Sequence, residues 1–263
     1  MERSSPAALE SWRVDLDVER LAAAPQFLEL ALPGRTARAF RASGVEMRGA
    51  GEVTWRGRPE QGGGLAVLTL HEGLVAGLIY LGDEVWEVAP DPRGGHRLER
   101  LDQERFPFCG EPLSDPGGEA PPPHRELPAV ARGPGGLTTV DVLVTYTPQA
   151  RDAAGGTAAI EATAQAAVDI ANTAFLDSEV DVRFRLALAA LSTRNDSGNY
   201  SADLSWLRND PTTAALRDDV GADLVSLLVE NAGGVCGVGY LGPSPSSVHQ
   251  VTARGCAVGN LSW

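Results

Sequence analysis

Histidine and cysteine are the residue types in this chain best suited to holding a metal or forming a reactive centre. The four histidines are His71, His96, His124 and His249. A catalytic zinc typically takes two histidines at positions i and i+4 of one helical face and a third protein ligand nearby, and it keeps one position open for water. The four histidines are scattered through the sequence, with no pair at that spacing. The sequence therefore predicts surface or strand histidines and no catalytic zinc site in the chain as written.

The three cysteines, Cys109, Cys236 and Cys256, are too few for a disulfide scaffold. In an oxidising compartment, a disulfide between Cys236 and Cys256 would close a loop of roughly 20 residues and stabilise the fold by about 3 kcal/mol in the chain-entropy model. In the cytosol the same two residues would be buried thiols. The pairing would leave Cys109 free, either as a functional thiol or as an oxidisable cysteine near the end of a domain.

The sequence lacks the signatures of other common catalytic chemistries. It has no Gly-x-Ser-x-Gly elbow of a serine hydrolase, and Gly233-Gly234 is not followed by the lysine that a phosphate-binding loop needs. Asp218, Asp219 and Asp223 form an acidic group, but the regular alternation of a calcium-binding loop is missing. We interpret these carboxylates as solvated charges at a helix end.

The charge balance excludes two classes of partner. The 263 residues contain 22 Lys+Arg, all of them arginine, and 35 Asp+Glu, for a formal net charge of -13. Such a charge repels nucleic acid and anionic lipid. The longest apolar runs are far shorter than the roughly 20 residues of a membrane-spanning helix, so we expect no nucleic acid and no membrane as partner. Residues 1–10 carry no basic stretch followed by an apolar core, so no signal peptide is visible.

Residues 1–113 alternate short apolar or aromatic runs with turns that contain glycine. This pattern is typical of an antiparallel sheet. The predicted strands are Ala37–Ala42, Glu52–Arg56, Leu65–Leu70, Leu74–Tyr80 and Glu84–Ala89, separated at Gly62–Gly64, Glu72-Gly73 and Gly82-Asp83. The stretch Leu98–Phe108 is expected to lead out of this β-rich domain.

Residues 114–136 form a linker by composition. The segment reads SDPGGEAPPPHRELPAVARGPGG, with six prolines and five glycines and no apolar periodicity. Proline fixes its own backbone dihedral and removes a hydrogen-bond donor, so Pro121–Pro123 should be extended and exposed. Proteases readily accept such a segment, and we expect an activating cut here.

Residues 137–263 follow a different pattern, in which buried strands alternate with helices. Val140–Tyr146 is a continuous apolar, β-branched run, as expected of a strand buried on both faces, and apolar residues at helical spacing predict a helix over Thr157–Leu176. The other predicted elements are strands at Val180–Leu191, Ala222–Val229, Gly237–Leu241 and Ser247–Cys256 and short helices at Asp203–Arg208 and Thr212–Asp219. The order predicts a parallel α/β sheet. The fold class is therefore α+β, an antiparallel β-rich domain followed by an α/β domain.

Several segments resemble bacterial reprolysin-like zinc metallopeptidases of the metzincin group. The runs VDVLVTYTPQARDAAGG, ADLVSLLVE, VCGVGYLG and GCAVGNLSW resemble the front half of their catalytic domain. The stretch from VTWRG through LTLHEGLVAGLIYLGDEVWEVAP to the cysteine of FPFCGEP resembles their propeptide. The resemblance implies that residues 1–113 are a prodomain and that residues 137–263 are an incomplete metzincin-like catalytic subdomain.

The resemblance also implies an activity for a full-length parent. In this family the signature His-Glu-x-x-His-x-x-Gly-x-x-His follows a segment like GCAVGNLSW, whereas this chain stops at Trp263. The parent is expected to be a secreted or extracellular zinc metalloendopeptidase zymogen that acts on protein or peptide substrates. The chain itself, truncated before the zinc-binding helix, is expected to be inactive, with no catalytic residue and no metal of its own.

Two sites take roles from the same resemblance. The thiolate of Cys109 would bind the catalytic zinc in place of the attacking water and keep the enzyme latent. Val238, Gly239 and Tyr240 would lie on an edge strand of the active-site cleft, where an extended substrate adds by backbone hydrogen bonds. An ordinary edge strand softened by glycine would have the same sequence. The alternative function is a non-catalytic inhibitor, in which the propeptide-like domain uses Cys109 against a related peptidase.

Overall fold

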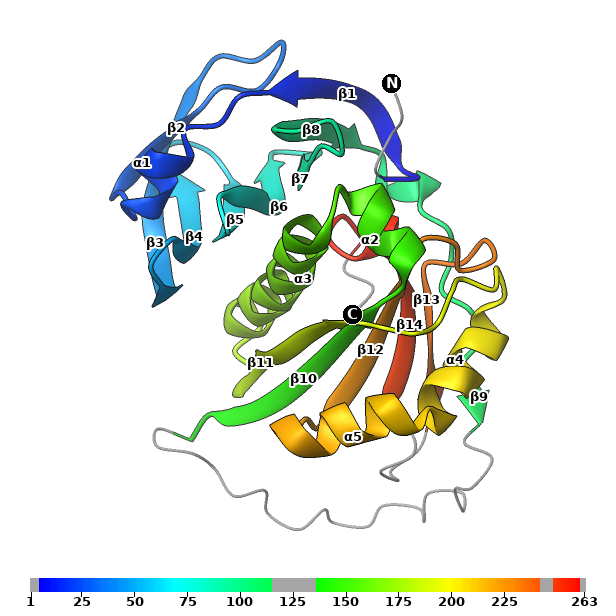
Figure 1. Cartoon of the computed structure of the whole chain (residues 1–263). Coiled ribbons are helices and arrows are strands. Elements are labelled where there is room, and N and C mark those ends of the chain that lie inside the picture. Colours follow the sequence, from blue (N-terminus) through cyan, green and yellow to red (C-terminus); the bar gives the residue numbers. More distant parts are fainter. Residues whose placement is uncertain (1–4, 115–135, 242–247, 261–263) are drawn as a thin grey trace. The chain divides into compact units, whose positions relative to one another are not determined.

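The glycine turns between the apolar runs of the N-terminal part reverse the chain repeatedly and build one antiparallel sheet, which curls (Figure 1). The computed structural model describes residues 5–114, 136–241 and 248–260. Within residues 5–106, eight strands pair in the order β1-β8-β7-β6-β5-β4-β3-β2. Their bounds are β1 (Ala8–Val14), β2 (Phe27–Leu30), β3 (Arg38–Gly49), β4 (Glu52–Pro59), β5 (Gly64–His71), β6 (Leu74–Leu81), β7 (Glu84–Pro90) and β8 (His96–Leu101). The predicted antiparallel, β-rich character is confirmed.

Tight turns set the register of this sheet. His71 pairs with Leu74 across a two-residue turn in which Glu72 and Gly73 both have positive φ, 46° and 77°. Positive φ at both central residues is the geometry that matches the twist of two antiparallel strands. The resulting register buries one set of side chains in a common core, in which Trp55 and Trp86 are 0% and 1% exposed. The short helix α1 (Val18–Ala22) adds Leu21 to this core.

Strand β8 corrects one expectation from the sequence. Leu98–Leu101 do not lead out of the sheet, because they lie in β8, which pairs with β1 on one side and with β7 on the other. The run HRLERL carries charged residues on both sides of Leu98 and lacks the apolar run of a central strand. Arg97 and Glu99 are nevertheless buried and form an ion pair at 3.4 Å. A buried pair of opposite charges thus replaces the apolar residues that the pattern of a central strand leads one to expect.

The second sheet combines parallel and antiparallel pairs. Among the described residues from 107 to 257, six strands pair in the order β11-β10-β12-β14-β13-β9. Parallel pairs join β10 to β11, β10 to β12 and β12 to β14, whereas β13 runs antiparallel to β14. The bounds are β9 (Leu113–Ser114), β10 (Thr138–Tyr146), β11 (Val182–Leu191), β12 (Leu224–Val229), β13 (Gly237–Leu241) and β14 (His249–Ala253). The predicted strands of this part are therefore present, and the parallel character holds for four of them.

The helices of the C-terminal part begin and end where the sequence supplies caps. They are α2 (Pro148–Ala154), α3 (Thr157–Asp177), α4 (Tyr200–Asn209) and α5 (Pro211–Val220), with a short 3-10 helix η3 (Arg254–Cys256). Another short 3-10 helix, η1 (Gln103–Arg105), follows β8 in the N-terminal part. Asn199 and Asp210 accept backbone N–H groups at the starts of α4 and α5, and Gly221, with φ of 66°, ends α5. Within the described ranges, no helix combines the length and the apolarity needed to span a membrane.

The described residues divide into two compact units, and each contains residues from both sides of the proline-rich segment. The first unit holds residues 5–106 together with 151–170 and 258–260, and the second holds 107–114, 136–150, 171–241 and 248–257. The predicted domain boundaries at 113/114 and 136/137 remain predictions. Residues 115–135, nearly all of the predicted linker, lie outside the described residues.

Candidate functional site

Strand β13, to which the sequence analysis assigned substrate binding, starts at a disulfide. Cys236 directly precedes β13 and is bonded to Cys256 in η3, with a distance of 5.5 Å between their Cα atoms. Both residues are buried, and the N–H of Ala253 donates to the carbonyl of Cys236 at 2.8 Å. The bond closes the part of the chain that contains β13 and β14, so it ties the start of β13 to the end of β14.

The side of β13 that faces away from β14 is covered by residues 108–114, which we call the pairing segment. The N–H of Cys236 donates to the carbonyl of Phe108 at 3.1 Å, and the N–H of Gly110 donates to the carbonyl of Gly237 at 2.8 Å. Farther along, Leu113 and Ser114 form β9 and pair in parallel with Tyr240 and Leu241. β13 is therefore the second strand from the edge of its sheet, because the chain itself occupies the outer side.

The three residues predicted to bind substrate lie on β13 but in different surroundings. Val238 is buried in the core of the second unit. Gly239 lies opposite Gln250 of β14, and the Tyr240 ring lies 5.4 Å from the guanidinium of Arg208. Substrate binding by these residues remains a prediction.

Cys109 lies between the two backbone hydrogen bonds that start the pairing segment. Its neighbours Phe108 and Gly110 both bond to the strand, whereas Cys109 itself is exposed and its thiol is free. The side chain of Phe108 is 92% exposed. The two backbone hydrogen bonds thus hold the chain on either side of Cys109, while the cysteine itself stays exposed. A role of this thiol in latency remains a prediction.

The histidines do not come together. His71 ends β5 and His96 begins β8, both in the first sheet, whereas His249 begins β14 in the second. His124 lies outside the described residues. Across residues 5–114, 136–241 and 248–260, no group of three or more histidine, cysteine, aspartate or glutamate side chains is placed to hold a metal ion. The donors present there do not fit a catalytic zinc, which needs at least three protein ligands.

His96 has a structural role instead. Its Nε2 atom accepts the N–H of Val75 at 2.9 Å, which requires the neutral imidazole with its proton on Nδ1. Burial lowers the pKa of His96, and the nearby carboxylate of Asp15 opposes this effect. The histidine therefore serves as a buried acceptor that connects β8 to the start of β6.

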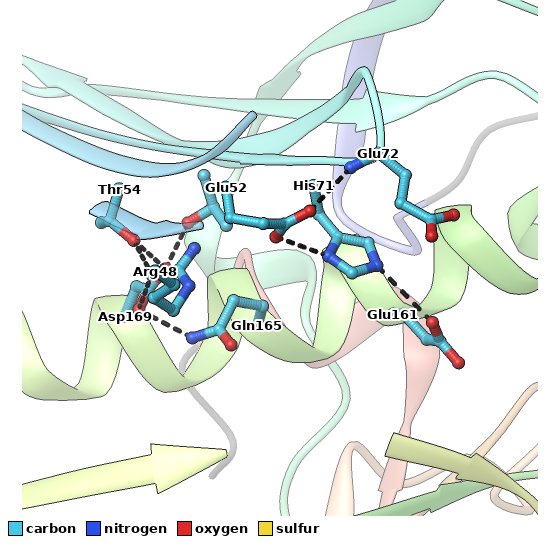
Figure 2. A network of polar contacts seen from close by, with 9 residues as sticks. Arg48, Glu52, Thr54, His71, Glu72, Glu161, Gln165 and Asp169 are labelled. Atoms are coloured by element: carbon cyan, nitrogen blue, oxygen red, sulfur yellow. Dashed lines mark hydrogen bonds and ion pairs between the residues drawn. The ribbon is translucent and has the colours of Figure 1, made fainter. Parts of the chain in front are cut away.

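A polar cluster on helix α3 was missed by the sequence analysis (Figure 2). Asp169 is 3% exposed, and its Oδ2 atom accepts the hydroxyls of Thr54 at 2.5 Å and of Thr69 at 2.6 Å. The Gln165 amide donates to Oδ1 at 3.0 Å, and Nη1 of Arg48 lies 3.4 Å from both carboxylate oxygens. Arg48 also donates to the hydroxyl of Thr54. One buried carboxylate thus receives donors from β3, β4, β5 and its own helix.

The environment of Asp169 acts on its ionisation in two directions. Burial raises the pKa of the Asp169 carboxyl, while Arg48, the two threonine hydroxyls and the Gln165 amide each act to lower it. Burial is the larger effect. The cluster therefore depends on these donors, because a buried carboxyl group that lacks hydrogen bonds is costly.

His71 forms a second contact with the same helix. Its Nδ1 atom lies 2.8 Å from Glu52 Oε2 and its Nε2 atom lies 3.5 Å from Glu161 Oε2 (Figure 2). The N–H of Glu72 donates to the other oxygen of Glu52 at 3.1 Å. The imidazole ring therefore lies between a carboxylate of the sheet and a carboxylate of α3.

The sequence does contain a signal for these contacts. Glu161, Gln165 and Asp169 follow one another at intervals of four in a helix that is otherwise rich in alanine. Residues at i, i+4 and i+8 lie on one face of a helix, so these three polar side chains form a single stripe. Their partners in β3, β4 and β5 come from a distant part of the sequence, which the periodicity of the helix does not identify.

Comparison with known proteins links the chain to metallopeptidases. Residues 137–262 match the family described as Metallo-peptidase family M12B Reprolysin-like. A Peptidyl-Asp metalloendopeptidase of Xanthomonas campestris pv. campestris is 28% identical over 281 aligned positions, which cover 99% of this chain and 66% of that protein. A Peptidyl-Asp metalloendopeptidase of Pseudomonas aeruginosa is 39% identical over 113 positions, covering 40% of this chain and 18% of that protein.

The chain thus spans slightly less than two thirds of the Xanthomonas relative. Among solved structures, metalloproteinase-II from Bacteroides fragilis aligns with 89% of this chain and 77% of its own length, at 12% identity and a TM-score of 0.47. The family match falls on the part of the chain whose segments resemble reprolysin-like catalytic domains. Residues 137–262 are therefore similar to the reprolysin-like metallopeptidases, and the chain as a whole aligns with proteins named as metalloendopeptidases.

Proposed function

We propose that this chain is a latent form of a zinc metalloendopeptidase, in which residues 1–113 are the prodomain. In this proposal, residues 137–263 supply the front half of the catalytic domain, including the strand β13 along which a substrate would bind. The pairing segment, which ends in β9, occupies the outer side of this strand and so blocks the binding of a substrate there. The parent protein would hydrolyse peptide bonds, and the cut that activates it would fall in residues 114–136.

The observation that carries this proposal is the occupation of β13. An extended peptide adds to a sheet by bonding to the free N–H and C=O groups of an outer strand. The carbonyl of Gly237 and the N–H of Cys236 are already used by Gly110 and Phe108. A peptide substrate would have to displace the pairing segment to reach these groups. Cys109 is exposed with a free thiol and lies between Phe108 and Gly110, which supports its proposed role in latency.

Zinc would be the metal of the parent enzyme, as the family implies. The described residues do not supply its ligands, so we propose no hydrolysis by this chain alone. Among the described cysteines, Cys109 alone lies outside a disulfide. In the parent enzyme its thiolate would bind the zinc in addition to the ligands that the catalytic domain supplies. The disulfide between Cys236 and Cys256 favours a secreted or extracellular location, because such bonds persist in oxidising compartments.

The names of the relatives suggest the peptide to use as a probe. Both are called Peptidyl-Asp metalloendopeptidase, so we propose peptides that contain aspartate as substrates of the parent. An extended peptide with a central aspartate can be titrated to millimolar concentration while the NMR signals of the β13 amides are followed. The intact chain should show no shifts at residues 236–241, and the Gly110→Pro variant, which lacks the N–H donor to Gly237, should show them.

Gly110→Ala is the matched control, because it keeps the N–H group and its added Cβ would meet Tyr200 and Val238 at ordinary contact distances of 3.4 Å. It should behave like the unchanged chain. Equal binding of the peptide by the unchanged chain and by Gly110→Pro would refute the proposed closure. Stoichiometric zinc together with hydrolysis that a chelator abolishes would refute the proposed inactivity of this chain.

A further inference from the structure

The division into compact units does not follow the order of the sequence. The first unit joins the N-terminal sheet to residues 151–170 and 258–260, which lie beyond the predicted cleavage segment. The second unit joins the pairing segment to the C-terminal sheet. A cut between residues 114 and 136 would therefore break the chain without breaking the contacts inside either unit.

The Asp169 cluster is a buried polar contact between α3 and the N-terminal sheet. Three of the donors to this carboxylate, on Arg48, Thr54 and Thr69, precede the predicted cut, and Asp169 follows it. A hydroxyl or guanidinium group that loses its partner while it stays buried is costly, and here Asp169 accepts both threonine hydroxyls and lies beside Nη1 of Arg48. The cluster therefore makes the N-terminal sheet bind α3 in this register in preference to an apolar surface that offers no carboxylate.

A second contact lies at Gly259. The side-chain amide of Gln103 donates to the Gly259 carbonyl at 3.3 Å, and Val258 is 1% exposed. A Cβ atom at Gly259 would lie 2.7 Å from Glu87 Oε2 and from a methyl group of Leu101. Side chains of the N-terminal sheet therefore pack closely on Gly259 and would have to shift to admit a side chain there.

We infer that the N-terminal fragment stays bound to the rest of the chain after a cut in residues 114–136, and that Asp169 is the main docking residue. The partner of the N-terminal sheet is thus the remainder of its own chain, recognised through a carboxylate that fits the donors of Thr54, Thr69 and Arg48. This inference rests on the proposed function, because it concerns the prodomain after processing. It makes activation a process of two steps, cleavage and then dissociation.

The experiment uses the full chain with a recognition site for a sequence-specific protease inserted within residues 115–135. Complete cleavage is established on a denaturing gel, and the fragments are then analysed by size-exclusion chromatography and native mass spectrometry over a range of concentrations. The unchanged protein should elute as one complex at micromolar concentration. In Asp169→Ala, the concentration at which the fragments separate should rise about tenfold or more, because two buried hydroxyls and Arg48 lose their acceptor.

Asp219→Ala is the matched control, because it removes an exposed carboxylate from α5 in the second unit and should separate at the same concentration as the unchanged protein. If Asp169→Ala does not fold before cutting, Asp169→Asn and the double variant Thr54→Val with Thr69→Val replace it, and both should weaken the complex.

Separation of the unchanged fragments at micromolar concentration would overturn the inference. Release by Gly110→Pro but not by Asp169→Ala would also overturn it, since the pairing segment would then hold the fragments. The readout is association alone, so it does not depend on zinc, peptide binding or hydrolysis.

Discussion

The disulfide between Cys236 and Cys256 leads to a quantitative prediction about how β13 is held in its sheet. Replacing both cysteines with alanine removes a crosslink between residues twenty positions apart. In the chain-entropy model a loop of this length contributes about 3 kcal/mol to the free energy of unfolding. With a urea dependence of about 1 to 3 kcal/mol per molar, the unfolding midpoint of the second unit should fall by about 1 to 3 M urea.

The assay is urea unfolding followed by circular dichroism, with and without a reducing agent. The reduced unchanged chain should unfold at nearly the same urea concentration as the double variant, because both lack the crosslink. Cys109→Ser is the control, since Cys109 is exposed and forms no disulfide, and its midpoint should not change. A midpoint for the double variant equal to that of the oxidised unchanged chain would refute the reasoning.

Three further substitutions test individual contacts by their effect on stability. Because burial lowers the pKa of His96, the contribution of this residue to stability is full above the unfolded-state pKa and is lost as the pH falls through the folded-state pKa. The variant His96→Gln can still accept the Val75 N–H, so its unfolding free energy, measured across pH 4 to 8, should depend less on acid than that of the unchanged chain. An unchanged pH profile would contradict this. Gly259→Ala should lower the thermal midpoint in calorimetry by a few degrees, because the methyl group overlaps side chains of the N-terminal sheet, and an unchanged midpoint would show that the packing is looser than described. Asn172→Ala should cost about 2 kcal/mol in urea unfolding, since the amide both donates to and accepts from the backbone of Phe184, and a loss below about 0.5 kcal/mol would count against these bonds.

Local patterns in the sequence predicted much of the fold. Strands β4 to β7 could be predicted because two-residue turns such as Glu72-Gly73 stand between apolar runs. Helix α3 and strands β10 and β12 could be predicted from long apolar patterns. Strands β1, β2 and β8 were missed. In β8 the charged residues Arg97 and Glu99 interrupt the apolar pattern, although they are buried as an ion pair.

The candidate site was less predictable, because its decisive contacts join distant residues. The segment VCGVGYLG led to β13, but nothing in the pattern showed that residues 108–114 would lie along it. In the same way, Asp169 lies in a readable polar stripe, whereas Thr54 and Thr69 are ordinary strand residues. Such pairings join residues far apart in the sequence within one unit, and no local rule of spacing encodes them.

Hydrogen exchange at the backbone of β13 tests the central claim most directly, namely that the pairing segment occupies the outer side of this strand. In the unchanged chain, the amides of Cys236 and Gly110 should exchange slowly, because each donates across this pair of segments. In Gly110→Pro, the Cys236 amide should exchange much faster, while the Ala253 amide, which bonds within the sheet to Cys236, should stay protected. Rapid exchange of Cys236 and Gly110 in the unchanged chain, at the rates of an unfolded peptide, would contradict the account.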